Sequence, residues 1–262
     1  MNLDKLGQQD SKVFIIAEIG NNHNGSFDRA KQMIDECIEL KVDCVKFQMR
    51  NLKEVYRESS LNKSGDDLGT EYVLDLLGEF ELSIEDQRKL RDYCKEKGIL
   101  YLCTPWDSKS IKVLEGFEVP AYKVASADLT NLPLLQLLSE TKKPLILSTG
   151  MSTEEEVKIT TSFLNDRKVN FTLLHCNSTY PAPYHDINLN WMKRLKGIHQ
   201  NIGYSGHERG IAVTLGAVAL GAKIIERHYT LDRHMEGPDH AASLEFNEFR
   251  DLVAGVRQLE ES

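Results

Sequence analysis

The sequence has few of the features that are typical of membrane proteins or of nucleic-acid-binding proteins. No apolar run among its 262 residues approaches the roughly 20 residues that a membrane-spanning helix needs. Its first residues, MNLDKLGQQDSK, are polar and include acids, unlike a secretory signal peptide. The formal net charge is −8, so the basic face that nucleic-acid binding requires is not expected. We therefore predict a cytoplasmic protein that acts on small molecules, with no nucleic-acid or membrane partner.

Paired cysteines and nucleotide-binding glycine motifs are also missing. The five cysteines are an odd, scattered set without the close spacing of zinc sites, which is typical of reduced thiols in the cytoplasm. Cys44, Cys103 and Cys176 fall within apolar runs, so we expect them to be small buried hydrophobic residues. Neither a GxGxxG nor a P-loop pattern occurs, so a nucleotide is not indicated.

What the sequence does contain is eight short apolar runs, each of which carries reactive residues late in the run. They alternate with segments of helical periodicity, which favours a parallel sheet, and eight units without a ninth favour closure into a barrel. We predict an α/β fold, a (β/α)8 TIM barrel forming one domain over residues 1–262; an open doubly wound sheet is the alternative. The runs are Val13–Gly20, Cys44–Gln48, Leu100–Trp106, Ala121–Ser126, Leu145–Gly150, Phe171–Cys176, Ile202–His207 and Lys223–Tyr229.

Capping signals mark several of the intervening helices. Ser26 and Ser83 precede segments with helical periodicity, and Gly98 is placed to end the second of them. Ser152 with Glu155 predicts a capping box after the fifth strand. The connection between the second and third strands is unusually long, and we expect its residues 50–81 to cover the barrel mouth.

Glu18 lies inside the first apolar run, within the stretch AEIGNNHNG. A buried carboxylate needs a partner, so turn geometry alone explains Asn24 and Gly25 but not Glu18. In a (β/α)8 barrel the active site is built at the C-terminal ends of the strands. We therefore expect a functional role for Glu18.

Two lysines and a ring of hydroxyls lie at the ends of other runs. Lys46 and Lys123 interrupt apolar segments, and this number of donors suits a small ligand that carries both a carboxylate and a phosphate. Salt bridges in the barrel interior, to Glu18 or Glu226, are the alternative interpretation. The hydroxyl residues are Thr104, Ser126, Ser148, Ser178 and Ser205.

His207 and His228 end the seventh and eighth runs, on strands that should be neighbours. Two imidazoles at matching positions predict a divalent metal, with Glu226 or Asp239 as oxygen ligands or as outer partners. Such a ligand set suits manganese, iron, cobalt or zinc. Two structural histidines, and for Asp239 an ordinary turn residue, are the alternatives.

Taken together, these stretches resemble the sialic acid synthase (N-acetylneuraminate synthase) family. The matching motifs are AEIGNNHNG, VKFQ, CTPWD, YKVASAD, LSTGMS, LLHCNSTYPAP, GYSGH, ERHYTLDR and GPDH, in family order over residues 13–260. The resemblance implies that phosphoenolpyruvate condenses with an N-acylated hexosamine such as N-acetylmannosamine. The products would be a nine-carbon 2-keto sugar acid, as used in surface polysaccharides, and phosphate.

The resemblance also implies roles for individual residues and for partners. His207 and His228 would hold the metal, Mn2+ foremost with Mg2+ or Co2+ as alternatives, in what we expect to be a homodimer. Gln48, Tyr180 and Asp239 would surround the sugar, while Glu18 and Glu226 would lie near the reacting carbons. The phosphoenolpyruvate pocket would comprise Lys46, Thr104, Lys123, Ser126, Ser148, Ser178 and Ser205, with the two lysines also serving catalysis.

Three departures from the family pattern bear on the acceptor. Gly206 and Glu208 flank His207, where relatives often carry Asp before the histidine, and His234 and Glu236 precede GPDH in place of Asn and Pro. Many relatives continue into an antifreeze-like domain whose arginine reaches the N-acyl group. Because this chain stops at Ser262, we expect either that it is a fragment or that the N-acyl contact is made otherwise.

Three other function classes stay open from the residues alone. One is an aldolase that forms a Schiff base through Lys123. Another is a phosphoenolpyruvate-dependent 3-deoxy-ulosonate synthase with a different aldose acceptor, which would need basic residues for an acceptor phosphate. The third is a non-catalytic sugar-binding barrel. Candidates for the extra basic residues are Arg50, Arg57, Arg209 and Arg233.

Overall fold

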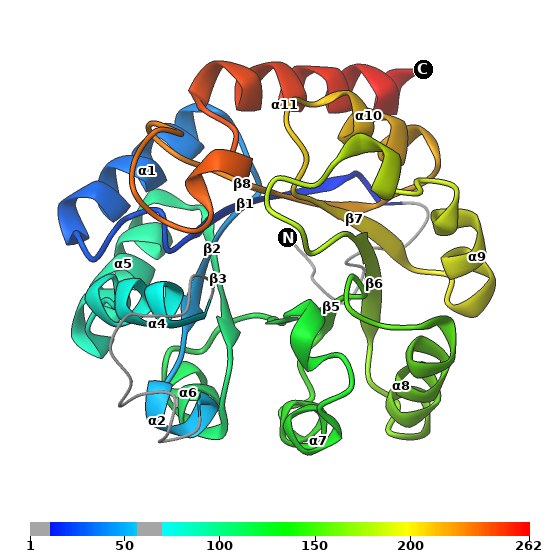
Figure 1. Cartoon of the computed structure of the whole chain (residues 1–262), viewed down its shortest axis with the longest axis horizontal. Coiled ribbons are helices and arrows are strands. Elements are labelled where there is room, and N and C mark those ends of the chain that lie inside the picture. Colours follow the sequence, from blue (N-terminus) through cyan, green and yellow to red (C-terminus); the bar gives the residue numbers. More distant parts are fainter. Residues whose placement is uncertain (1–10, 57–69) are drawn as a thin grey trace.

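The computed structural model describes residues 11–56 and 70–262, and it confirms the predicted barrel (Figure 1). All eight apolar runs form strands, and every recorded ladder is parallel, in the order β3-β2-β1-β8-β7-β6-β5-β4. No ladder joins β3 to β4 in the described part of the chain, so the barrel is nearly closed. The strands are β1 (Phe14–Gly20), β2 (Cys44–Met49), β3 (Leu100–Pro105), β4 (Tyr122–Val124), β5 (Leu145–Ser148), β6 (Phe171–Cys176), β7 (Ile202–Gly206) and β8 (Ile224–His228).

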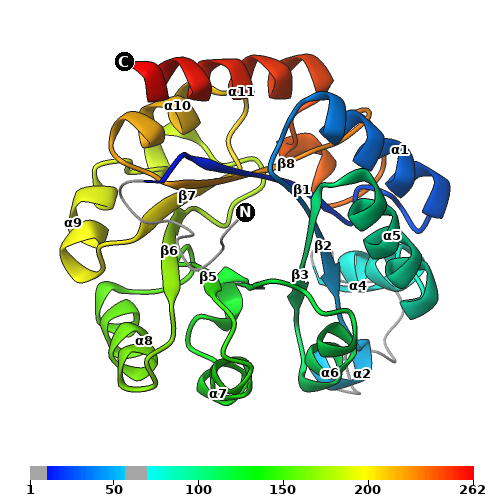
Figure 2. The same cartoon turned by 180° about the vertical axis from the view of Figure 1, so that it is seen from behind.

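The helices surround the strands, as both cartoon views show (Figures 1 and 2). Their apolar sides pack on the outer face of the sheet, where most of the buried hydrophobic residues lie. None of the helices in the described segments is both long and apolar enough to cross a lipid bilayer. The α-helices are α1 (Phe27–Glu39), α2 (Leu52–Val55), α4 (Thr70–Glu79), α5 (Ile84–Lys97), α6 (Ser108–Gly116), α7 (Leu132–Glu140), α8 (Glu154–Asp166), α9 (Trp191–Ile198), α10 (Ala212–Ala219) and α11 (Phe246–Glu261).

Two of the predicted helix starts are confirmed and one is wrong by a residue. Ser26 and Ser83 cap α1 and α5, and Gly98 ends α5 in the left-handed conformation with φ 78°. The capping box of α8 pairs Thr153 with Glu156, not Ser152 with Glu155. The reason is that the N–H of Ser152 donates to Thr149 O, so Ser152 belongs to the turn that follows β5.

The inner face of the barrel changes from apolar to polar along each strand. Alternate residues of a strand point to the same face, so Phe14 and Ile16 of β1 are followed on that face by Glu18. In β8, Ile224 is followed in the same way by Glu226 and His228. A small apolar cluster therefore fills one end of the barrel, and the charged residues meet at the C-terminal end of the strands.

The connection that follows β2 is described only in part. It contains α2 and α4, while residues 57–69 lie outside the described residues. Part of the segment expected to cover the mouth, including Arg57, falls on those residues, so that expectation stays a prediction.

Candidate active site

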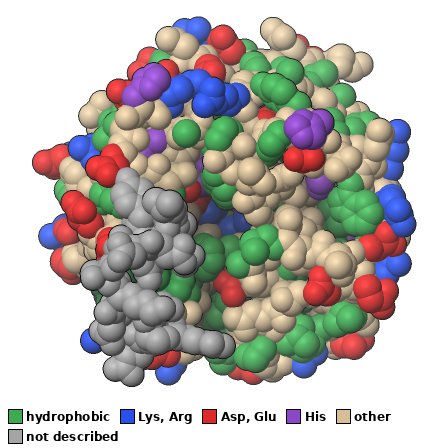
Figure 3. Space-filling view, viewed as in Figure 1, with side chains coloured by type: hydrophobic (Ala, Val, Ile, Leu, Met, Phe, Trp, Pro, Cys, Tyr) green, Lys and Arg blue, Asp and Glu red, His purple; other side chains and the backbone are tan. Residues whose placement is uncertain are grey.

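A cavity of about 210 Å³ lies at the C-terminal ends of the strands. The hollow near the centre of the face in Figure 3 has basic side chains at its base. Of the fourteen residues predicted to bind metal or substrate or to act in catalysis, thirteen line this cavity; the other, Asp239, has its Oδ2 3.8 Å from Nδ1 of His228. The predicted residues that line it are Glu18, Lys46, Gln48, Thr104, Lys123, Ser126, Ser148, Ser178, Tyr180, Ser205, His207, Glu226 and His228.

Lys46 is the hub of a buried charge network on the floor of this cavity. Its Nζ lies 2.7 Å from Oε2 of Glu18 and 3.9 Å from Oε2 of Glu226, and it donates to Thr104 Oγ1 over 3.0 Å. These side chains are at most 5% exposed. The interior salt bridge that the sequence left as an alternative is therefore present.

Lys123 occupies the other side of Glu226. Its Nζ is 3.7 Å from Oε1 of Glu226, and it donates to Ser148 Oγ over 2.7 Å and to the carbonyl of Val124 over 3.1 Å. Ser205 also donates to Glu226, over 3.2 Å. Two cations and two carboxylates thus alternate across the floor, with hydroxyls around them.

Burial and charge shift the pKa values of these groups in different directions. Burial raises the pKa of Glu18 to about 7, aided by the nearby Glu226 carboxylate and opposed by Lys46. Burial alone would lower the pKa of Lys46, but Glu18 and Glu226 outweigh it and the pKa is raised. Burial lowers the pKa of Lys123, with Glu226 opposing. Lys46 is therefore firmly cationic, while Glu18 can exchange a proton near neutral pH.

Gln48 connects this network to Arg50 and, through Arg50, to Trp106, a residue that we did not assign to the site. Its Nε2 donates to Oε1 of Glu18 over 2.9 Å, while its Oε1 accepts from Nη2 of Arg50. The guanidinium of Arg50 lies 4.7 Å from the ring centre of Trp106, which lines the cavity. A guanidinium only donates, so it fixes the Gln48 amide with its NH2 toward Glu18. The sequence signal for Trp106 was its place directly after β3.

The hydroxyl groups of Ser126 and Ser178 lie near the loop that follows β5. Ser126 Oγ accepts from the N–H of Gly150 over 3.1 Å. A Cβ at Gly150 would lie 2.7 Å from Ser178 Oγ, so glycine allows the Ser178 hydroxyl to reach this loop. Met151 and Cys176 also line the cavity. Cys176 is buried, as predicted, but it is part of the site wall as well.

His207 has the hydrogen bonds expected of a metal ligand. Its Nδ1 lies 2.5 Å from the carbonyl of Asn177, which can only accept, so this nitrogen carries the proton. In the neutral ring this tautomer leaves a lone pair on Nε2, which lies 2.9 Å from the hydroxyl of Tyr180. Burial alone would lower the pKa of His207, but the nearby Cys176 thiol opposes burial and the pKa is raised. A backbone carbonyl that orients a histidine in this way is a common outer partner at metal sites.

His228 complements His207 across the end of the β7–β8 pair. The two ring centres are 5.4 Å apart, and Nδ1 of His228 is buried without a hydrogen-bond partner among the described residues. Burial and the surrounding cations lower its pKa well below the usual value, so the ring is neutral. No group of three or more His, Cys, Asp or Glu side chains in residues 11–56 and 70–262 is arranged to enclose an ion. Two neighbouring imidazoles of this kind are residues that could hold a divalent metal ion.

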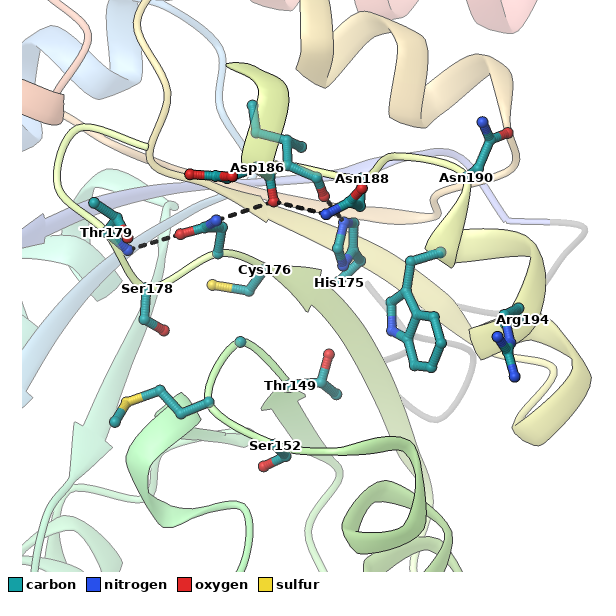
Figure 4. Close-up of a pocket in the computed structure, with 15 residues that line it drawn as sticks. Thr149, Ser152, His175, Cys176, Ser178, Thr179, Asp186, Asn188, Asn190 and Arg194 are labelled. Atoms are coloured by element: carbon teal, nitrogen blue, oxygen red, sulfur yellow. Dashed lines mark hydrogen bonds between the residues drawn. The ribbon is translucent and has the colours of Figure 1, made fainter. Parts of the chain in front are cut away.

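A second, wider cavity adjoins the first on the β5–β6 side (Figure 4). It measures about 730 Å³ and shares Met151, Cys176 and Ser178 with the first cavity. Its outer wall includes Trp191 and Arg194 of α9. The two cavities therefore meet at the C-terminal ends of β5 and β6.

Comparison with known proteins shows which chains this one is similar to. A model of the NeuB family matches residues 33–262. The chain is 38% identical to the N,N'-diacetyllegionaminic acid synthase of Campylobacter jejuni, over 96% of this chain and 77% of that protein. It is also 38% identical to the human N-acetylneuraminate-9-phosphate synthase, over 94% of this chain and 70% of that protein.

A solved structure agrees with these relatives. The crystal structure of the N-acetylneuraminic acid synthetase of Leptospira borgpetersenii, in complex with citrate, superposes with a TM-score of 0.87. The two sequences are 34% identical, and the alignment covers 96% of this chain and 85% of that one.

Proposed function

Because the chain belongs to the NeuB family of synthases, we propose that it condenses phosphoenolpyruvate with an N-acylated hexosamine. The products are a nine-carbon 2-keto sugar acid of the sialic or legionaminic type and inorganic phosphate. The observation that carries the proposal is the floor of the cavity, where two buried lysines and a ring of hydroxyls lie beneath two histidines.

Phosphoenolpyruvate binding requires the two lysines to exchange their carboxylate partners for ligand oxygens. With Glu18 and Glu226 both ionised, the four-residue floor is close to neutral and attracts a multiply charged anion weakly. Protonation of Glu18, whose pKa is about 7, frees Lys46 to pair with the ligand. Charge-assisted bonds from Lys46 and Lys123, with hydroxyl donors beside them, then hold the carboxylate and phosphate.

His207 and His228 would hold the divalent cation, for which we propose Mn2+. When bound, the cation supplies Lewis-acid polarisation of the acceptor aldehyde. The protein contributes the tautomer of His207, fixed by Asn177, and the neutral state of His228. Gln48 contacts Glu18, Asp239 contacts His228, and both lie close to Gly20; we assign them to the hydroxyls of an open-chain sugar.

In the bond-forming step, carbon 3 of phosphoenolpyruvate attacks the aldehyde carbon and carbon 2 becomes electron-deficient. Neutral Glu18 is placed to protonate the aldehyde oxygen as it becomes an alcohol. The resulting carboxylate then takes a proton from the water that adds to carbon 2. The bond between carbon 2 and the phosphate oxygen then breaks, and the hydroxyl on carbon 2 gives its proton to the departing phosphate, which leaves the ketone and inorganic phosphate. Holding both substrates in one pocket supplies much of the acceleration.

A phosphate-release assay with phosphoenolpyruvate, Mn2+ and a panel of aldoses tests the proposal. We expect release only with N-acylated hexosamines, and loss of activity in Glu18→Gln and Lys123→Met. Turnover with pentose phosphates instead would assign the chain to the 3-deoxy-ulosonate synthases. Borohydride trapping of pyruvate on Lys123 would indicate a Schiff-base aldolase, and no turnover with any aldose would favour a binding protein.

A further inference from the structure

Behind the two histidines, on the outer side of the sheet, lies a buried ion pair that the proposed reaction does not use. Arg227 precedes His228 on β8, and Glu208 follows His207 just after β7. Nη1 of Arg227 is 2.9 Å from Oε1 of Glu208, and both side chains are 0% exposed. Because neighbouring residues of a strand point to opposite faces, Arg227 points away from the cavity that Glu226 and His228 line.

Arg227 holds the backbone after His207 as well as the Glu208 side chain. Its Nη1 donates to the carbonyl of Gly210 over 2.8 Å and to Thr214 Oγ1 of α10 over 2.8 Å, and its Nη2 donates to the carbonyl of Glu208. The carbonyls belong to the segment that leaves β7 directly behind His207. One guanidinium on β8 therefore fixes the main chain next to the other histidine.

The Glu208 carboxylate also accepts hydrogen bonds from residues other than Arg227. Its Oε2 accepts from the hydroxyl of Tyr204 over 2.8 Å, and its Oε1 accepts from Thr214 over 3.1 Å. Burying two charges is costly, and apolar residues of similar volume usually stabilise such a position at least as well. Stability therefore does not explain why this pair lies between the sheet and α10.

Gly206 shows how tightly the pair is built in. A Cβ at Gly206 would lie 2.7 Å from Oε2 of Glu208 and 2.9 Å from Cδ of Arg227. Gly206 is not at positive φ, so glycine is needed here for space rather than for backbone conformation. In the ladder between β7 and β8, Gly206 is the partner of Arg227. The Glu208 carboxylate occupies the space that a side chain at position 206 would need.

We propose that Arg227 and Glu208 are positioning residues that set the spacing of His207 and His228, and thereby the affinity of the site for a divalent cation. The pair touches neither substrate nor the ring nitrogens. It ties the end of β7 to the end of β8, one residue from each histidine, and so fixes the two rings with their centres 5.4 Å apart. This inference rests on the metal assignment made under the proposed function.

The decisive variant is the double substitution Glu208→Gln with Arg227→Met. It removes both charges together, and the amide oxygen of the introduced glutamine can accept from one of the two hydroxyls, Tyr204 or Thr214, while its NH2 group donates to the other, so the protein should stay folded. We expect Mn2+ binding, measured by calorimetry and by electron paramagnetic resonance, to weaken about tenfold, at the low end of the range for outer partners of metal ligands. The dissociation constant for phosphoenolpyruvate should not change, because its lysines lie elsewhere, and excess Mn2+ should restore kcat.

Two further variants and a control complete the experiment. Arg227→Lys keeps the charge but loses the fork of donors, so its Mn2+ affinity should fall between the wild type and the double variant. Gly206→Ala should weaken Mn2+ binding because its methyl group displaces the Glu208 carboxylate, and it keeps the test valid if the double variant does not fold. Arg257→Met, which removes a partly buried ion pair with Asp43 at the start of β2, should bind Mn2+ normally.

The outcomes separate this inference from the metal assignment. Wild-type protein that binds no Mn2+ would overturn both. Wild-type protein that binds Mn2+, together with folded double and Gly206→Ala variants of unchanged affinity, would overturn the positioning role alone. An equal loss of affinity in Arg257→Met would show a general effect of stability and would also overturn it.

Discussion

Glu18 and any anion that enters the cavity compete for the same cation, Lys46. Burial raises the pKa of Glu18 to about 7, so below that pH the side chain is neutral and Lys46 is free for the ligand. Above it, the carboxylate competes for the same lysine. We expect kcat/KM for phosphoenolpyruvate to fall as the pH rises through about 7, which a pH series of initial rates will measure.

Phosphoenolpyruvate titrates as well, so the matched variant is Glu18→Gln. It keeps the shape of the side chain but has no proton to exchange. The inflection that belongs to Glu18 should disappear from the residual rate and from phosphoenolpyruvate binding, leaving only that of the ligand. An unchanged profile in this variant would assign the titration to another group.

The two lysines can be distinguished from structural salt bridges by substitution with methionine. A charge-assisted contact contributes about 1.5–3 kcal/mol. Lys46→Met and Lys123→Met should therefore weaken phosphoenolpyruvate binding by roughly 10- to 150-fold, at about 1.4 kcal/mol per tenfold change. Calorimetric titration provides the measurement, and normal affinity in both variants would restrict the lysines to a structural role.

At the scale of single elements, the start of α8 offers a clean comparison of two adjacent hydroxyls. Thr153 accepts from the N–H of Glu156, while Ser152 lies in the preceding turn. Thr153→Ala should lower the free energy of unfolding by about 1 kcal/mol, as loss of an N-cap usually does. Ser152→Ala should have a much smaller effect, and urea unfolding of the two variants measures the difference.

The elements also show what local sequence predicts well. Ser83 and Gly98 enclose α5 where capping chemistry places them, because those signals act within one turn of the helix. Around Ser152 the sequence offers two hydroxyls and three acids in succession, so several capping boxes satisfy the same rule. The hydrogen bond from Ser152 N–H to Thr149 O, which depends on how β5 ends, decides between them.

For the whole molecule, a metal that binds the folded state alone should stabilise the fold. The gain is about 2.7 kcal/mol when the free ion is at 100 times its dissociation constant. We expect Mn2+ to raise the melting temperature of the wild type in a concentration-dependent way. The double substitution of His207 and His228 by alanine should abolish this shift; a shift that persists would place the ion elsewhere.

The sequence by itself determined the barrel and most of the cavity lining. Alternation along each strand is a local property, and in a closed parallel sheet all C-terminal ends meet, so Glu18, Lys46 and His228 had to converge. The acceptor sugar and the metal stay predictions, because neither follows from the position of a strand.

Only the tertiary structure decided which groups pair with which. The Lys46–Glu18 salt bridge depends on distances across the barrel, and the Gln48–Arg50–Trp106 chain depends on how the loop after β2 turns back. The pairing of Arg227 with Glu208 could not be predicted from the sequence either. The two residues are separated by 18 others, and each is an ordinary charged neighbour of a histidine. Packing of α10 against the β7–β8 pair brings them together, because contacts between distant segments form only when the sheet and its helices assemble.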